Sequence, residues 1–146
     1  MADTIGIART AFEEIATAFP KLESRIHQDD PVDLSMSIPK QTGLNFDVEL
    51  NLQNHDELHF GVGEFWCPWF PCTRPQKVEQ FKNAVIGFIA GDSRVLEHRR
   101  GGRVVRAELQ APENGAWVTV ATSDHSWWPF PWQKNFHVMQ NPKAAL

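Results

Sequence analysis

Apolar residues recur every three or four positions at the start of the chain. They are Ile5, Ala8, Phe12, Ile15, Phe19, Leu22 and Ile26. This spacing predicts an amphipathic helix, with Asp3 or Thr4 as its N-cap. Pro20 interrupts the stripe without changing its phase, so we expect a kink or a short break there and a second helical piece that runs to about Gln28.

The period then changes from 3.6 residues to 2. Apolar and polar residues alternate over 32–38, 44–52 and 58–66, and turn-forming residues separate the three runs. This alternation predicts three consecutive half-buried strands in an antiparallel meander. The segment 67–72, Cys-Pro-Trp-Phe-Pro-Cys, follows, and its two prolines predict an irregular stretch, because proline cannot donate to a sheet ladder.

A second helix is predicted after this segment. Its apolar face holds Val78, Phe81, Val85, Phe88 and Ile89. Thr73 is the expected N-cap, and Gly91 stands where a C-terminal cap glycine belongs. A last strand is predicted over 117–122, after the turn at Asn114 and Gly115.

Between them, Gly101-Gly102 predicts a tight hairpin of strands 95–100 and 103–110, because glycine tolerates the positive φ angles of a two-residue turn. In the expected register, one apolar face of the hairpin holds Leu96, His98, Val105, Ala107 and Leu109. It also places Glu97 opposite Arg106 on the polar face, as a cross-strand ion pair.

The predicted order is helix and three strands, followed by a second helix and three strands. Helices segregated from antiparallel strands indicate an α+β fold, here with one sheet of about six strands and two main helices. The length of 146 residues predicts a single domain, 1–146. Both αβββ halves, 1–72 and 73–146, end in a proline-aromatic segment, which leaves an internal duplication open.

Charge is unevenly distributed along the chain. Residues 1–73 carry four basic and twelve acidic residues, whereas residues 74–146 carry ten basic and six acidic residues, and the whole chain has a net charge of −4. We therefore expect no nucleic-acid partner. Neither a membrane-spanning apolar run nor a signal peptide is visible, so we expect a cytoplasmic protein without a membrane partner.

Tryptophan and phenylalanine are concentrated in the two proline-aromatic segments. The residues that we single out are Trp66, Trp69, Phe70, Trp128, Phe130 and Trp132. Stiff proline-tryptophan segments build rigid clefts for a ligand or for a partner's anchor residue. The alternative is that both segments cover an end of the sheet as part of its core.

Arginines gather around the glycine turn, above all Arg99, Arg100 and Arg103. Guanidinium groups bind carboxylates and phosphates, so this hairpin is a candidate site for an anionic ligand or an acidic partner. One alternative is a solvated hairpin tip. Another is a homodimer in which the acidic half of one copy meets the basic half of the other.

Catalytic and metal signals are weak. His59 and the neighbours Asp124 and His125 are candidate proton carriers, although no catalytic motif surrounds them. Four residues separate Cys67 from Cys72, so a zinc site would need further ligands, such as His125 and His137, and nothing in the spacing requires one. We expect no cofactor.

The order helix, meander, helix and hairpin in a small acidic chain resembles type III secretion chaperones, and it is also similar to small immunity proteins of bacterial toxin systems. The resemblance implies a homodimer that binds a secreted segment, or tight binding to one toxin. The proline-tryptophan segments fit neither class specifically. Rigid aromatic density without a catalytic motif leads us to expect a non-enzymatic binding protein that recognises a protein partner through these segments and the arginine hairpin. The alternative is a small-ligand-binding protein or enzyme with a cleft between the sheet and the tryptophan-rich tail.

Overall fold

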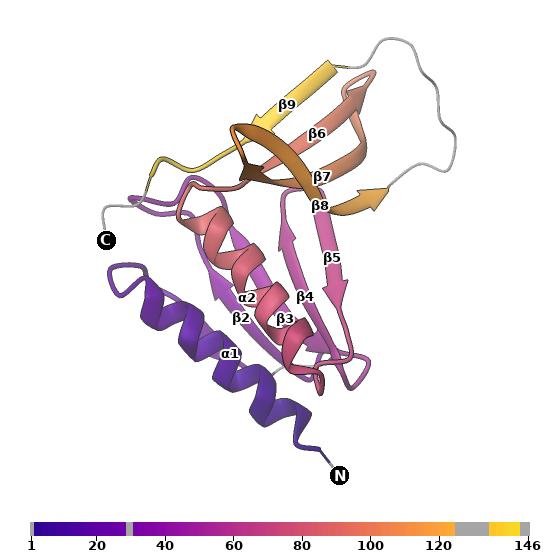
Figure 1. The fold of residues 1–146 in the computed structure, drawn as a ribbon. Coiled ribbons are helices and arrows are strands. Elements are labelled where there is room, and N and C mark those ends of the chain that lie inside the picture. Colours follow the sequence, from indigo (N-terminus) through magenta and orange to yellow (C-terminus); the bar gives the residue numbers. More distant parts are fainter. Residues whose placement is uncertain (1, 29–30, 125–134, 144–146) are drawn as a thin grey trace.

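The computed structural model describes residues 2–28, 31–124 and 135–143, which form two helices and two antiparallel sheets (Figure 1). The first sheet has the strand order β1-β2-β3-β4-β5. Its strands are β1 (Arg25–His27), β2 (Leu34–Ile38), β3 (Val48–Gln53), β4 (Glu57–Val62) and β5 (Phe65–Trp69). The second sheet has the order β8-β7-β6-β9, made by β6 (Arg94–Arg100), β7 (Arg103–Glu113), β8 (Ala116–Asp124) and β9 (Asn135–Met139).

The α+β antiparallel class is confirmed, but the six-strand count and the αβββ–αβββ order are wrong. The third alternating run divides at a two-residue turn, Gly63-Glu64, where Gly63 has a φ of +55°. β5 then includes Pro68, which an edge strand tolerates because one side of its backbone needs no ladder partner. The segment that the prolines predict to be irregular is therefore half strand.

Helix α1 (Thr4–Ala18) begins as predicted, because the backbone N–H of Gly6 donates to the Asp3 side chain at 2.9 Å. The kinked extension to Gln28 is wrong. The chain leaves the helix at Phe19, since a residue before proline avoids the α conformation. Residues 25–27 form β1 instead.

Helix α2 (Pro75–Ile89) buries its predicted apolar face at Phe81, Val85, Phe88 and Ile89. Gly91 has a φ of +83°, which suits the predicted C-terminal cap. Thr73 is not the N-cap, because that position is taken by Arg74, which makes no side-chain cap bond.

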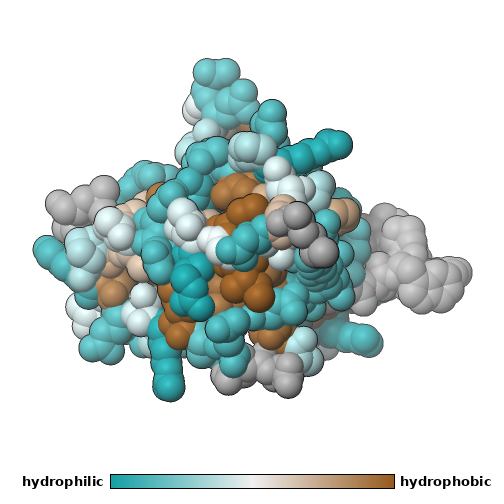
Figure 2. Space-filling model, turned by 90° about the horizontal axis from the view of Figure 1, so that it is seen from below, coloured by the Kyte–Doolittle hydropathy of each residue, from teal (hydrophilic) through white to brown (hydrophobic). Residues whose placement is uncertain are grey.

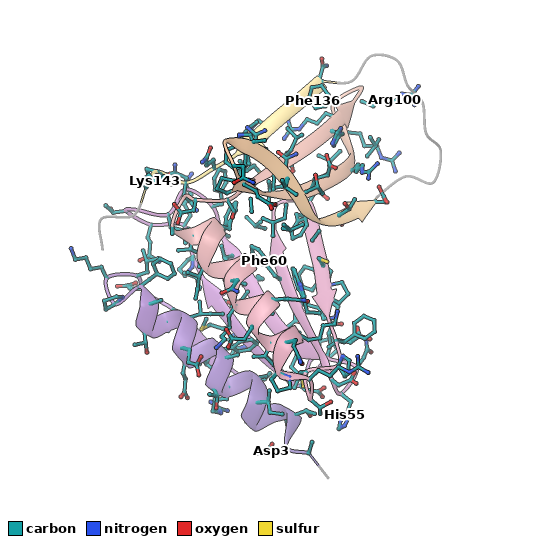
Figure 3. All side chains as sticks on the ribbon, in the orientation of Figure 1. Asp3, His55, Phe60, Arg100, Phe136 and Lys143 are labelled. Atoms are coloured by element: carbon teal, nitrogen blue, oxygen red, sulfur yellow. The ribbon has the colours of Figure 1, made fainter. Side chains whose placement is uncertain are left out.

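Both helices pack on the same face of the first sheet, α1 over β2 and β3 and α2 over β4 and β5 (Figure 1). The inward residues of the sheet are apolar, and Phe60 lies between them and α2 (Figure 3). The same core cluster continues into the second sheet through Val95, Ala107, Leu109 and Met139. One hydrophobic core thus joins the helices to both sheets.

The predicted glycine turn forms, with Gly101 and Gly102 at φ angles of +57° and +78°. The register beyond it is wrong, because a β-bulge lies between His98 and Arg99. Arg99 faces Val104 as predicted, but Glu97 faces Ala107 instead of Arg106. A shift of one residue exchanges the two faces of a strand. Val95 and Glu97 therefore point to the core side, and Leu96 and His98 point away from it.

Candidate functional site

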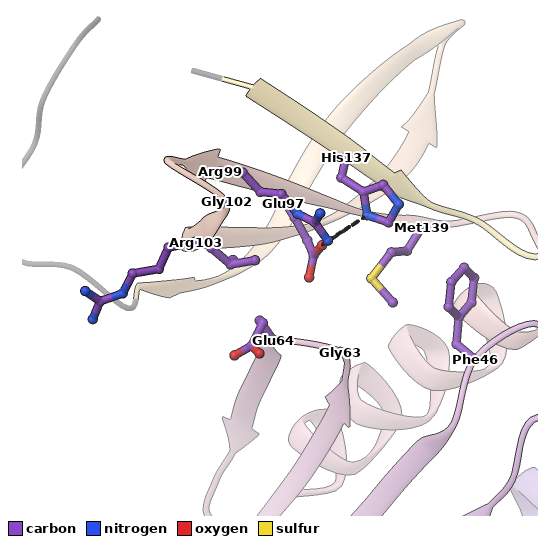
Figure 4. Close-up of a pocket in the computed structure, with 10 residues that line it drawn as sticks. Phe46, Gly63, Glu64, Glu97, Arg99, Gly102, Arg103, His137 and Met139 are labelled. Carbon is purple, nitrogen blue, oxygen red and sulfur yellow. Dashed lines mark hydrogen bonds and ion pairs between the residues drawn. The ribbon is translucent and has the colours of Figure 1, made fainter. Parts of the chain in front are cut away.

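An open groove of about 800 Å³ lies between the β4–β5 turn and the inner face of the second sheet (Figure 4). Its walls come from the segment before β3, the β4–β5 turn, the β6–β7 hairpin and β9. The residues are Phe46, Gly63, Glu64, Glu97, Arg99, Gly102, Arg103, Val104, His137 and Met139. This volume is in the range of small-molecule sites in proteins.

Glu97 is the central charged residue of the groove. It is only 2% exposed, and its carboxylate accepts hydrogen bonds from Arg99 Nη2 at 2.9 Å and from His137 Nδ1 at 3.0 Å. The backbone N–H of Glu64 also donates to it. A buried carboxylate requires such donors, because its desolvation is otherwise very costly. Glu97 therefore links β6, β9 and the β4–β5 turn around one charge.

Arg99 and His137 are both partly exposed. The buried carboxylate therefore fixes the position of two side chains that reach the groove surface. A bond from Nδ1–H to Glu97 fixes the tautomer of a neutral His137 and leaves Nε2 as an acceptor. The Arg99 Nε atom is buried and has no hydrogen-bond partner among the described residues. What the groove wall presents are the partly exposed ends of these two side chains, of which Glu97 engages one guanidinium nitrogen and one ring nitrogen.

The other end of the groove is apolar, with Phe46 and Met139 on either side (Figure 4). Glycine suits position 63 at its base because the φ there is +55°, and a Cβ would lie close to the Met139 sulfur at 3.0 Å and to a Glu97 carboxylate oxygen at 3.4 Å. The site thus combines a charged end with a hydrophobic end.

The ionisation of Glu97 follows from its surroundings. Burial raises the pKa of this carboxyl, but the hydrogen bonds from Arg99 and His137 lower it by more, so the pKa lies below its ordinary value of 4.5. On the opposite face of the second sheet, burial also raises the pKa of Glu108. The hydrogen bonds from His98 and Thr119, together with the charges of His98 and Arg106, outweigh that effect and bring the pKa of Glu108 below its ordinary value.

These two carboxylates predict acid lability. Because their pKa values are lower in the folded than in the unfolded chain, the unfolded chain binds more protons, and stability falls as the pH drops below about 4.5. We expect the urea midpoint of the wild type to fall between about pH 6 and about pH 3. Glu97→Gln should show a smaller fall over this range, whereas Glu13→Gln, on the exposed face of α1, should keep the wild-type slope. Equal slopes in all three proteins would contradict the assignment.

The predicted aromatic residues have different positions. Trp69 points into the core and lies 5.9 Å from the Phe81 ring, as the alternative interpretation of the segment expects. Trp66 is on the opposite face of β5 and is partly exposed, and Phe70 follows β5 and is half exposed. Trp128, Phe130 and Trp132 lie outside the described residues.

Phe70 follows β5 at the lower end of the molecule, where α1 also begins (Figure 1). Figure 2 shows this end from below, with a hydrophobic area in the middle and polar side chains around it. Ile5, in the first turn of α1, is also exposed. The groove is at the other end of the first sheet, so the aromatic segment and the groove are separate features.

Only two of the three predicted hairpin arginines lie at the same site. Arg99 and Arg103 line the groove, but Arg100 is at the tip of the second sheet (Figure 3). The sequence interpretation missed Phe46, Gly63, Glu64, Glu97 and Met139. A signal for Glu97 was present, since it stands two residues after Val95 and so shares its face of the strand, but the expected register placed it in solvent.

Two of the candidate proton carriers, His59 and Asp124, lie outside the groove and interact with other side chains. His59 is buried and bonded to Trp66 and Glu57, and Asp124 ends β8 and lies 3.5 Å from Arg106. His125 lies outside the described residues.

The candidate metal ligands are also dispersed. Cys67 is in β5 and Cys72 precedes α2, and both are free cysteines, whereas His137 bonds Glu97 in the second sheet. Within the described ranges, no three His, Cys, Asp or Glu side chains are grouped to hold a metal ion.

Neither helix in the described part of the chain has the length and apolar character needed to cross a membrane. Comparison with protein-family models, with curated proteins and with solved structures finds no match. The likeness to secretion chaperones and immunity proteins therefore stays a prediction, and the groove is the feature that points to a function.

Proposed function

We propose that the protein binds a small organic anion, a carboxylate or a phosphate monoester, in the groove between its two sheets. The observation that carries this proposal is the buried Glu97 carboxylate, which holds Arg99 and His137 side by side at the groove wall. Charged networks of this kind seldom improve on apolar packing as a source of stability. Their occurrence in a cleft is typical of functional sites.

The placement of the N–H donors favours an anion. Glu97 neutralises the charge of Arg99, and the lining adds one further basic residue, Arg103, and one further carboxylate, Glu64, so an anion would be selected by the guanidinium donors and not by an excess of positive charge. The Glu97 bond uses one terminal nitrogen of Arg99, so other guanidinium N–H groups remain for a ligand oxygen. Nε2 is the ring nitrogen of His137 that Glu97 leaves for a ligand.

The apolar end of the groove supports a ligand with a hydrocarbon or aromatic body. Phe46 and Met139 offer contact surface there, and the Met139 side chain adapts to different shapes. We therefore favour amphipathic acids, such as aryl or short alkyl carboxylates and their phosphate counterparts, over inorganic ions.

The test is a thermal-shift and calorimetric screen of aryl and alkyl carboxylates and phosphate monoesters, each paired with its neutral amide or alcohol. At least one acid should raise the melting temperature, and its neutral counterpart should not. Arg99→Gln and His137→Gln should each weaken that binding about tenfold or more. Arg106→Gln is the matched control, because Arg106 lies on the same hairpin and points away from the groove. No response to any acid, or equal binding of acid and amide, would reject the proposal.

A protein partner is the second candidate function. It is favoured by the exposed Phe70 and the hydrophobic area at the lower end of the molecule (Figure 2). Pull-down with Phe70→Ala beside the wild type tests it, and capture of the same partners by both proteins would remove Phe70 from that role.

A further inference from the structure

The outer face of the first sheet carries a second feature, independent of the groove. Both described helices cover the inner face, and the outward residues align in cross-strand rows. One row is His27, Ser35, Asn51, His59 and Pro68. The next is Arg25, Ser37, Glu49, Gly61 and Trp66. These two rows are thus mostly polar across five strands, and they hold one large aromatic ring, Trp66, at the β5 edge.

A chain of hydrogen bonds holds Trp66 in place. Its indole N–H donates to His59 Nδ1 at 2.6 Å, and His59 Nε2 lies 3.0 Å from the Glu57 carboxylate. His59 Nδ1 must accept this bond, so the ring is neutral and its proton is on Nε2, facing Glu57. The hydrogen bonds from Asn54 and His59 hold the pKa of Glu57 below its ordinary value. Glu57 is therefore ionised at neutral pH, as this arrangement requires.

Gly61 lets the ring lie across the sheet. A Cβ at this position would be 2.2 Å from Trp66 Cε3 and 2.5 Å from Cζ3. The indole therefore occupies the space of a side chain on β4, with one ring face against the backbone, and the residue is still 39% exposed. Since His59 already satisfies the N–H, what Trp66 offers a ligand is an apolar ring surface in a fixed orientation.

The neighbours of this ring are short or charged polar groups. Ser37 and Glu49 are in the same row as Trp66, and Glu49 is two strands away, about 10 Å at the usual strand spacing. Glu49 and Glu57 would repel a phosphate backbone, which disfavours nucleic acid. The lack of other large apolar side chains in these two rows disfavours a protein hot spot, which needs a desolvated apolar centre.

We infer that this face binds a neutral oligosaccharide, with one sugar ring stacked on Trp66 and the next units hydrogen-bonded to Glu49 and Ser37. A pyranose ring has C–H groups on one side, which suit an indole face, and hydroxyl groups around its edge. Carboxylate and hydroxyl side chains accept and donate hydrogen bonds to such groups. The site does not depend on the groove, because Trp66 points to the outer face of the sheet.

Calorimetry with the hexamers of cello-, malto-, xylo- and chito-oligosaccharides tests this inference. At least one hexamer should bind the wild type, and Trp66→Ala should weaken that binding about tenfold or more. Trp66→Phe should retain part of the affinity, because a smaller ring face remains. Gly61→Ala should weaken binding without removing the indole, since the new Cβ displaces the ring. These two variants also decide the matter if Trp66→Ala does not fold.

Trp117→Ala is the matched control, because Trp117 is 38% exposed and belongs to the second sheet. It should bind the hexamer like the wild type. The inference is overturned if no hexamer binds, if Trp117→Ala weakens binding as much as Trp66→Ala, or if Trp66→Phe and Gly61→Ala both bind like the wild type. Binding of polyuridylate in place of every sugar, lost in Trp66→Ala, would likewise overturn it and assign the ring to base stacking.

Discussion

Replacing Phe60 by alanine should lower the free energy of unfolding by about 3–5 kcal/mol. The Phe60 ring is completely buried, and it meets Phe65 at 5.6 Å and Phe88 at 5.9 Å in edge-to-face contacts. It thereby joins β4, β5 and α2 at one point (Figure 3). Alanine would remove this contact and leave a cavity that rigid neighbouring strands cannot close.

Urea unfolding followed by circular dichroism measures this effect. Phe136→Ala is the control with the same chemical change, because Phe136 is 58% exposed, and its cost should stay below about 1 kcal/mol. A Phe60→Ala variant as stable as Phe136→Ala would show that this ring does not hold the core together.

Glu97→Ala is expected to cost about 2–3 kcal/mol and to abolish ligand binding in the groove. Breaking a fully buried ion pair costs about 3–5 kcal/mol, but here water reaches Arg99 and His137, so part of the loss is recovered. The variant also removes the acceptor for the Glu64 N–H and releases β9 from the β4–β5 turn. Both effects act on the groove walls.

Chemical denaturation and calorimetry with the acid identified in the screen measure the two losses together. Glu113→Ala, at the exposed end of β7, is the matched control and should change neither quantity. Full ligand affinity in a folded Glu97→Ala variant would separate Glu97 from the site. Unchanged stability would mean that water replaces Glu97 as hydrogen-bond acceptor for Arg99, His137 and the Glu64 N–H without loss of free energy.

Strict periodicity was enough to predict much of the fold. The alternation at Leu34, Met36 and Ile38 predicts the inward face of β2, and helical spacing predicts the buried face of α2. These predictions succeed because the burial of one face decides both the element and its orientation. Two tight turns also form as their glycines predict.

The errors arise where a single residue changes the register or where pairing is long-range. No local pattern announces the bulge before Arg99, yet it turns Glu97 inward and creates the charged centre of the groove. β1 and β9 are short strands whose pairing partners are supplied by the rest of the fold. The candidate site was partly predictable for the same reason. Arg99 and Arg103 follow from the hairpin, whereas Phe46 and Met139 require the tertiary structure.

The position of β9 also affects the order in which the chain matures on the ribosome. α1, the first sheet and α2 are complete once Ile89 has emerged, but β6 lacks its outer neighbour until Asn135 to Met139 follow. At ~5–20 residues per second, the chain between Arg100 and Asn135 takes roughly 2–7 s to synthesise. During that time the nascent protein has an open strand edge on β6, which is a template for wrong pairing. His137 and Met139 close that edge and complete the groove in the same event, so a bound acid would select chains that have finished folding.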